Sequence, residues 1–388
     1  MKNKFKKGMA LTLCILMFFG GSVFARAENI ALHTVARPSA NCKSAVLMEA
    51  TTGQILFEQN ADEALPPASV TKIMTLLLVM EAIEAGKLKY DDALSASAYA
   101  CSMGGSQIYL KEGEQMSVED LIKSVVIASA NDAAVVLAEA ISGSESAFVE
   151  QMNEKAKALG MKNTHFENTN GLDDTATNHV TSARDIAIMS RELIAHEKIL
   201  EYSSIWMDSV RNGEFGLTNT NRLVRFYKGA TGLKTGSTAK AGFCISATAV
   251  RDGMSLICVI MGAESRDIRN ATATTLLDWG FANFTCYDSG VTYSEELPIL
   301  GGVKATCRVE SKTVKIPMEK NAVSDIQTRL ELPSVLKAPI EKGACIGSIV
   351  YSVNGEVIAK SDVYATESVK EIHFFDIWIR ILKFMLIN

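Results

Sequence analysis

A serine and a lysine three positions apart begin a long apolar segment of the chain. Ser69 and Lys72 follow two consecutive prolines, and the apolar spacing after them predicts a buried helix that ends near Gly86. Residues three apart project from one helical face, which is the geometry of a nucleophile and its base. The same Ser-x-x-Lys spacing occurs at Ser237 and Ser334. Ser69 differs from both because it is expected at a helix N-terminus, where developing negative charge is favoured.

A second polar group, Ser129-Ala130-Asn131, forms a short bridge between two predicted helices, 118–128 and 133–141. A hydroxyl and an amide in such a place can transfer protons and bind a substrate. Ser, Asn and Asp are also the residues that commonly cap helices, so ordinary capping explains the pattern as well. This position alone therefore leaves both interpretations open.

A third group, Lys234-Thr235-Gly236, is the only Lys-Thr-Gly sequence in the chain and precedes a predicted strand, 242–250. An exposed turn at the end of the strand is the simple alternative. Gly236, however, has no side chain and lets the backbone of a ligand approach the strand closely.

The three groups lie in a region where strands precede and follow a block of helices. Strand-like runs between Ala45 and Gln59 flank Thr-Thr-Gly, and the runs 242–250 and 254–261 flank Arg-Asp-Gly, a strong hairpin signal. Between these strands the sequence predicts helices at 118–128, 133–141, 145–159 and 183–195. This order predicts an α+β domain whose sheet gathers both ends of the region.

From about residue 284 the pattern changes to strand-like runs punctuated by prolines. Asn354-Gly355 lies between two of them and is the clearest hairpin signal. We therefore predict a larger domain over residues 28–283 and a small all-β domain over residues 284–366.

The N-terminal residues 1–27 have the form of a secretory signal peptide. Four lysines precede an apolar run from Met9 to Phe19, and Ala-Arg-Ala at 25–27 matches a small-x-small cleavage site. The run is shorter than the roughly 20 residues that span a bilayer. Removal of residues 1–27 moves the formal net charge from −5 to −10, because five basic and no acidic residues are lost. An acidic exported protein is a poor nucleic-acid binder.

The C-terminal residues 367–388 are predicted to form an amphipathic helix. Polar residues spaced by three and four fall on one helical face, and large apolar residues cover the others; the polar set is His373, Asp376, Arg380 and Lys383. We predict a helix that lies in a membrane interface. Packing against the protein's own core is the alternative, and the charged residues disfavour a true span.

The overall composition excludes a long disordered tail and a zinc site. Hydrophobic residues make up 48% and charged residues 21% of the chain. Of the eight cysteines, one lies in the predicted signal peptide, and no Cys-x-x-Cys pair occurs. Buried free thiols are therefore expected, with a single disulfide bridge as the alternative.

Taken together and in this order, Ser69 with Lys72, Ser129 with Asn131, and Lys234-Thr235-Gly236 resemble the three motifs of the penicillin-recognising serine enzymes. Within that group the chain is most similar to the low-molecular-mass penicillin-binding proteins, which are serine D-alanyl-D-alanine carboxypeptidases. The resemblance runs from about residue 45 to 366. It implies a transpeptidase/β-lactamase-like domain followed by a small β domain and an amphipathic C-terminal helix.

The resemblance also implies a role for each residue. Ser69 attacks the carbonyl between the two terminal D-alanines and forms an acyl-enzyme, Lys72 takes its proton, and Ser129 passes the proton to the leaving amine. Residues implied in substrate binding are Asn131, Lys234, Thr235, Gly236 and Ser237. The backbone N–H groups of Ser69 and Ser237 are the expected oxyanion hole, and neither a metal nor a cofactor is needed.

The implied partners are the peptidoglycan stem peptide ending in D-Ala-D-Ala, β-lactam antibiotics as covalent inhibitors, and the outer face of the cytoplasmic membrane. A class A β-lactamase is one alternative, but Glu167 and Asn170 are one residue closer than in that family, and Ala130 stands where it usually has Asp. A transpeptidase and a non-catalytic scaffold that binds the cell wall are the others.

Overall fold

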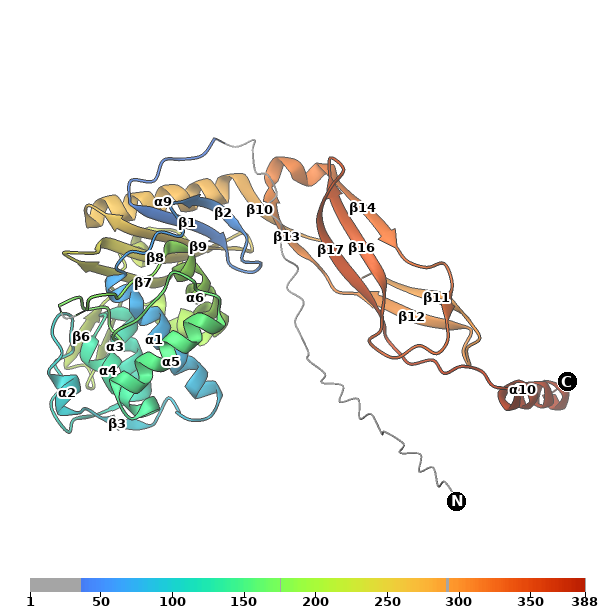
Figure 1. The fold of residues 1–388 in the computed structure, drawn as a ribbon, viewed down its shortest axis with the longest axis horizontal. Helices are drawn as coiled ribbons and strands as arrows, with labels where there is room; N and C mark the ends of the chain where they lie inside the picture. Colours follow the sequence, from blue (N-terminus) through green and yellow to red (C-terminus); the bar gives the residue numbers. More distant parts are fainter. Residues whose placement is uncertain (1–35, 175, 291–292, 388) are drawn as a thin grey trace, which may run out of the picture.

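The chain folds into two regions that follow each other along the sequence (Figure 1). The computed structural model describes residues 36–174, 176–290 and 293–387. The predicted signal peptide, residues 1–27, lies outside the described residues. The first region mixes strands and helices and the second is rich in strands, as the sequence predicts.

An antiparallel sheet forms the centre of the first region, with strand order β2-β1-β9-β8-β7. Its strands are β1 (Ser44–Glu49), β2 (Ile55–Gln59), β7 (Ala230–Thr238), β8 (Gly242–Arg251) and β9 (Met254–Ala263). Both predicted hairpins are confirmed, and β1 pairs with β9, so the sheet does gather both ends of the region. In the β8–β9 turn, Asp252 and Gly253 have φ angles of 49° and 76°, which suits a tight hairpin turn.

Helices cover both faces of this sheet (Figure 1). One face carries the predicted helices, namely α1 (Lys72–Glu84), α3 (Val118–Ile127), α4 (Asn131–Ser142), α5 (Glu145–Ala158) and α6 (Ala183–Ala195). The other carries α9 (Arg266–Asn283). Along β9, Ile257 and Val259 pack into the core on the first face, whereas Leu256 and Cys258 pack against α9. Because both faces are buried, the strand is a continuous apolar run instead of an alternating one.

Short elements surround the helical block. They are α2 (Ala98–Cys101), α7 (Lys198–Ser203) and α8 (Leu223–Phe226), with two small hairpins made of β3 (Ala93–Ser95) and β4 (Gln115–Ser117), and of β5 (Met207–Val210) and β6 (Phe215–Thr218). Thr218 of β6 and Ser106 of the loop before β4 line the site described below.

The segments that carry the predicted site differ locally from expectation. Residues 68–71 form a 3-10 turn and α1 begins at Lys72, so Ser69 lies before the α-helix and not in its first turn. The Lys-Thr-Gly sequence at 234–236 lies inside β7. The alternative of an exposed turn at the end of a strand is therefore wrong.

The second region consists mainly of strands. A six-stranded sheet has the order β14-β16-β17-β12-β11-β15, and β10 pairs separately with β13. The elements are β10 (Phe284–Asp288), β11 (Ser294–Leu300), β12 (Thr306–Ser311), β13 (Lys315–Glu319), a 3-10 helix (Lys320–Asp325), β14 (Ile326–Glu331), β15 (Leu336–Lys337), β16 (Cys345–Val353) and β17 (Glu356–Ala365). The predicted hairpin at Asn354-Gly355 joins β16 to β17.

The last residues form a strand-like segment followed by a helix, which corrects the predicted boundary at residue 367. Val369 is fully buried and exchanges two backbone hydrogen bonds of 2.9 Å with Ile340. The N–H of Ile372 donates to the carbonyl of Gly301 at 2.8 Å. Residues up to 372 therefore belong to the β region. The carbonyl of His373 accepts the N–H groups of Asp376 and Ile377 at the start of the helix, and α10 spans only Phe374–Ile387.

The cysteines of the described residues are free thiols, as the sequence predicts. Cys244, Cys258 and Cys307 are buried, whereas Cys345 is exposed. Burial raises the pKa of the Cys244 thiol to about 11, which keeps it protonated and unreactive at neutral pH.

Candidate active site

The polar groups singled out in the sequence meet where β7 passes the 3-10 turn before α1. Lys72 Nζ donates to Ser69 Oγ at 2.9 Å and to the carbonyl oxygen of Asn170 at 2.8 Å. Lys234 Nζ donates to Ser129 Oγ at 2.8 Å. The site thus contains two serine–lysine pairs, one within a single turn of chain and one between distant segments.

Both lysines are buried, and burial sets their protonation. Lys72 is 0% and Lys234 1% exposed. Burial and the charge of Lys234 lower the pKa of Lys72 well below its ordinary value, while Asp132 opposes the shift. Burial, followed by the charge of Arg269, lowers the pKa of Lys234 to about 7. A neutral Lys72 amine beside Ser69 can therefore accept a proton near neutral pH.

The turn between α3 and α4 presents Ser129 in an unusual backbone conformation. Its φ is 64°, which lies in the left-handed region. Residues other than glycine rarely adopt this backbone conformation, and where they do it often marks a functional site. Asn131, the first residue of α4, donates from Nδ2 to the carbonyl of Gly104 at 2.6 Å. Its buried Oδ1 has no partner among the described residues. Asn131 therefore ties the start of α4 to the loop that carries Gly104.

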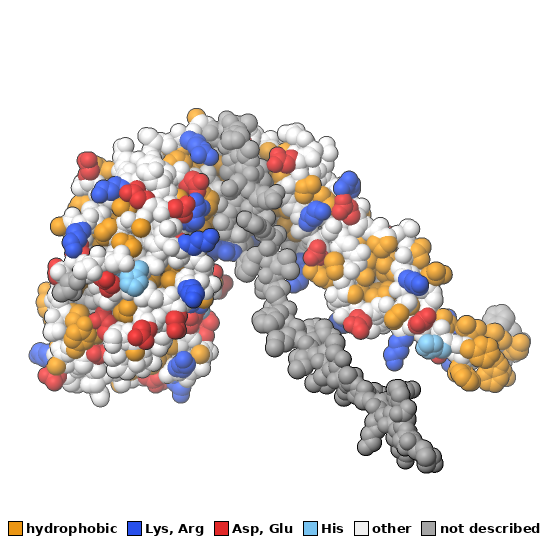
Figure 2. Space-filling model, in the orientation of Figure 1, with side chains coloured by type: hydrophobic (Ala, Val, Ile, Leu, Met, Phe, Trp, Pro, Cys, Tyr) orange, Lys and Arg blue, Asp and Glu red, His pale blue; other side chains and the backbone are white. Residues whose placement is uncertain are grey.

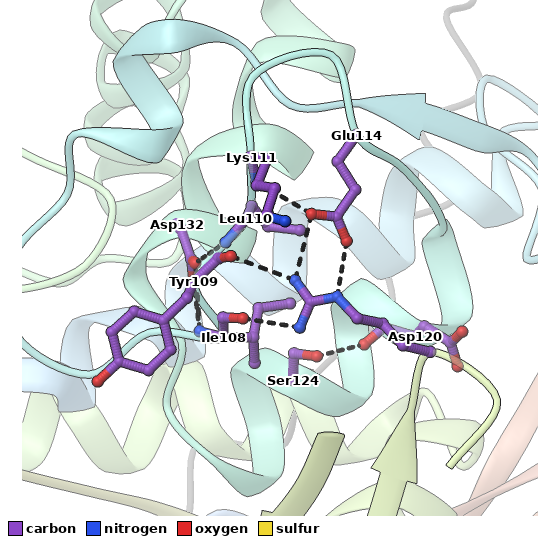
Figure 3. Close-up of polar contacts among 9 residues, drawn as sticks. Ile108, Tyr109, Leu110, Lys111, Glu114, Asp120, Ser124 and Asp132 are labelled. Carbon is purple, nitrogen blue, oxygen red and sulfur yellow. Dashed lines mark hydrogen bonds and ion pairs between the residues drawn. The ribbon is translucent and has the colours of Figure 1, made fainter. Parts of the chain in front are cut away.

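The loop opposite this turn is fixed by two charged side chains (Figure 3). Asp132, fully buried on α4, accepts the N–H groups of Ile108 at 3.2 Å and Leu110 at 3.1 Å. Arg211, from the β5–β6 hairpin, donates to the carbonyl of Ile108 at 2.8 Å and to Glu114 at 2.7 Å. These bonds hold the loop that carries Ser106 against the site. Asp132 and Arg211 have no distinguishing pattern in the sequence, because their partners are distant along the chain.

Two glycines allow segments to touch the turn that carries Ser69. A Cβ on Gly236 would lie 2.7 Å from the backbone nitrogen of Ser69. Gly171 has a φ of +84°, and a Cβ there would lie 1.9 Å from the carbonyl oxygen of Ala68. Gly236 was expected to make room for the backbone of a ligand. The structure shows that Gly236 makes room for the 3-10 turn that carries Ser69.

A buried histidine ties the loop that includes Asn170 to the same turn. His179 Nδ1 accepts the N–H of Glu167 at 3.0 Å, so in the neutral ring Nε2 carries the proton. Nε2 lies 2.8 Å from Thr71 Oγ1, whose hydroxyl donates to Ala68. Burial is the main reason that the pKa of His179 falls to about 4. The ring therefore acts as a neutral positioning group.

This histidine predicts an acid-dependent loss of stability. Between pH 6.5 and about 4 the unfolded chain binds a proton at His179 that the folded protein does not. The free energy of unfolding should therefore fall as pH falls, by about 1.4 kcal/mol per pH unit over that window. Urea unfolding at several pH values should show a slope in His179→Gln that is smaller than the parent's by this amount. The exposed His165→Gln serves as the matched control, and an unchanged slope in His179→Gln would contradict the assignment.

A pocket of about 570 Å³ opens from Ser69 along β7. The predicted Ser129, Thr235, Gly236 and Ser237 all line it. It also contains three arginines that the sequence interpretation missed, namely Arg222, Arg266 and Arg269. Arg269 is 3% exposed and donates to the carbonyl of Cys244 at 3.4 Å. Two of the three belong to α9, a helix that the sequence interpretation did not predict.

The fold and the site agree with comparisons to known families. A family model described as D-alanyl-D-alanine carboxypeptidase matches residues 31–265. A second, the C-terminal domain of penicillin-binding protein 5, matches residues 281–371. D-alanyl-D-alanine carboxypeptidase DacF of Bacillus subtilis is 41% identical over 367 residues, which cover 93% of each chain.

Solved structures give the same result. Penicillin-binding protein 5 from Haemophilus influenzae has a TM-score of 0.78 at 33% identity, covering 87% of this chain and all of its own. The ampicillin-bound form of penicillin-binding protein D2 from Listeria monocytogenes has a TM-score of 0.58 at 33% identity, covering 63% of this chain and all of its own. The chain therefore belongs to the S11 family of serine-type D-alanyl-D-alanine carboxypeptidases, the low-molecular-mass penicillin-binding proteins of peptidoglycan metabolism.

Proposed function

We propose that this carboxypeptidase removes the terminal D-alanine of a peptidoglycan stem peptide through an acyl-enzyme on Ser69, with Lys72 as the base. The observation that carries this assignment is the 2.9 Å contact between Lys72 Nζ and Ser69 Oγ. It occurs where burial and a second cation lower the pKa of Lys72. Mass spectrometry of the intact protein after penicillin treatment tests the assignment.

In the first half of the reaction Lys72 Nζ accepts the Ser69 proton as Oγ bonds to the carbonyl carbon of the penultimate D-alanine. The backbone N–H groups of Ser69 and Ser237 stabilise the resulting oxyanion. The bond to the leaving nitrogen then breaks. Ser129, held by Lys234 at 2.8 Å, delivers its proton to that nitrogen and takes the Ser69 proton from Lys72, so the Lys72 amine is neutral again. D-alanine departs and the acyl-enzyme remains.

In the second half a water molecule attacks the ester carbonyl carbon. Lys72 accepts a proton from that water, and the same proton returns to Ser69 Oγ when the ester bond breaks. The products are the shortened peptide and the free enzyme. We assign Asn131 to binding the substrate amide by resemblance; its Oδ1 has no partner among the described residues, and Asn131 lies behind the residues that line the pocket.

Recognition of the terminal carboxylate explains why the enzyme acts at chain ends. Thr235 presents a hydroxyl to the pocket, 2.8 Å from Thr220 Oγ1, and Arg269 lines the same wall. Lys234 adds a buried positive charge behind them. A peptide bond further from the chain end places no carboxylate at these groups, so it is bound less well.

Two alternatives are less well supported. A β-lactamase would need Glu167 as a deacylating base, but its carboxylate accepts the N–H groups of Thr177 at 2.7 Å and Asn178 at 3.1 Å. These bonds hold a neighbouring loop. A non-catalytic scaffold does not need lysines buried beside serines, because burying an amine is costly. Release of D-alanine by the purified protein distinguishes an enzyme from a scaffold.

We further propose that the mature protein is exported and attached to the outer face of the cytoplasmic membrane through α10. Figure 2 shows hydrophobic side chains clustered on this helix. Phe374 is 74%, Phe375 73% and Trp378 53% exposed, so these side chains are not packed on the protein's own core. None of the helices in the described ranges is both long enough and apolar enough to traverse a bilayer. An interfacial position fits α10.

Truncation at two neighbouring sites tests the anchor. A chain ended after His373 lacks only α10 and is expected to be soluble, with undiminished activity on a short peptide. A chain ended after Thr366 also loses buried Val369, which should cost about 1.5–3 kcal/mol of stability.

The mature full-length protein should stay with membranes in 1 M salt, because apolar burial and not surface charge holds it. Sedimentation with vesicles and urea unfolding are the measurements. Release of the full-length protein by salt, or loss of activity after the cut at His373, would show that α10 is not the anchor.

A further inference from the structure

We propose that the leaving-group side of the pocket contains a second anion subsite, formed by Arg222 and Arg266, that selects terminal D-residues with an acidic side chain. This inference rests on the proposed function, since it extends the same pocket beyond the groups that bind the terminal carboxylate. It adds a substrate class, namely peptides whose last residue carries two carboxylates.

The charge of the pocket is the first observation. Three arginines line it, and no acidic side chain is among its described lining residues. Lys234 lies buried behind Thr235, and a bound carboxylate would favour its protonated form. A single terminal carboxylate compensates one of these charges. The remaining cations favour a ligand with a second negative charge.

The state of the two outer arginines is the second observation. Arg269 is buried and bonded to Cys244 and Asn270. Arg222 and Arg266 are exposed, and within the described part of the chain no ion pair or side-chain hydrogen bond engages either guanidinium. Their charges act on Arg269, whose pKa is lowered to about 10 chiefly by burial and then by Arg266 and Arg222. An anion bound between them would relieve this repulsion.

The position of the two arginines is the third observation. Arg222 immediately precedes α8, and Arg266 is the first residue of α9, so they approach the pocket from separate segments. The same pocket extends from Ser69 past Thr235 to Trp206 and Phe226. Its volume of about 570 Å³ leaves room for a side chain longer than the methyl group of D-alanine. Guanidinium groups at such a place suit a carboxylate.

Matched substrates test this subsite. The acyl-L-Lys-D-Ala peptides ending in D-Glu and in D-Gln have the same shape and differ by one charge. The parent should hydrolyse the D-Glu peptide with a kcat/KM about tenfold above that of the D-Gln peptide, which corresponds to about 1.4 kcal/mol. The ratio should fall several-fold in Arg222→Gln and in Arg266→Gln, and approach one in the double variant. Because each value is a ratio, a general loss of activity in a variant cancels.

A charge control and a separate assay complete the experiment. Lys228→Gln removes a positive charge two residues after α8 and outside the pocket lining, and it should keep the parent's ratio. A parent ratio below about threefold, no hydrolysis of either peptide, or a ratio that survives in the double variant overturns the subsite. Release of D-alanine from the D-Ala-D-Ala peptide is measured in parallel. If no D-alanine is released, the proposed function is overturned. If D-alanine is released but the ratio of kcat/KM for the D-Glu and D-Gln peptides is near one, only the subsite is overturned.

Discussion

Ser69→Ala is expected to abolish both penicillin labelling and D-alanine release. The alanine variant keeps the pocket and its cations but has no Oγ to form an ester, so the covalent step has no nucleophile. The loss in kcat should be at least about 10⁴-fold, as for nucleophiles that act as one unit with their base. Intact-mass spectrometry should show one added penicillin on the parent and none on the variant.

Ser237→Ala is the matched control, because Ser237 lines the same pocket and also begins a Ser-x-x-Lys sequence. It should still be labelled, since its expected contribution to the oxyanion hole comes from its backbone. Peptide mapping of the labelled parent should place the adduct on Ser69. An adduct on Ser237, or labelling that persists in Ser69→Ala, would contradict the assignment of the nucleophile.

The elements with strong local patterns were predictable from the sequence. The β8–β9 hairpin follows from two apolar runs around Arg-Asp-Gly, and α1 follows from its continuous apolar composition. The helix α9 was missed because its first half is rich in Thr, Asn and Asp, which have low helix propensity. Packing against the outer face of the sheet stabilises it instead. Arg266 and Arg269 were missed with it.

The sequence indicated the residues of the three motifs that meet at the pocket, but neither the arginines beside them nor the contacts between them. Spacing alone placed Ser69 near Lys72, whereas the bond from Lys234 to Ser129 joins distant segments and depends on the fold. The 3-10 turn at Ser69 has a tertiary cause, because Gly171 and Gly236 press against it. The strand-like pairing of Val369 with Ile340 could not be predicted from the sequence, because a single pair of backbone hydrogen bonds leaves no periodic pattern.

The second large effect is expected at Lys72. Lys72→Arg places a guanidinium, which cannot deprotonate in a protein, where a neutral amine is required. Acylation by penicillin and release of D-alanine should both fall by about 10³-fold or more. Since Lys72 is 0% exposed, the larger arginine can also disturb packing. Lys72→Met, which is neutral and of similar length, is therefore measured beside it.

The methionine variant should lose acylation to the same extent while unfolding at a higher urea concentration at pH 7. The reason is that the pKa of Lys72 in the folded protein is lowered, so the unfolded chain binds a proton that the folded protein resists. That cost disappears when the amine is removed. In the parent, the acylation rate should rise with pH as Lys72 loses its proton, and this rise should be absent from the residual activity of both variants. Activity within tenfold of the parent in either variant, or an unchanged pH dependence, would refute Lys72 as the base.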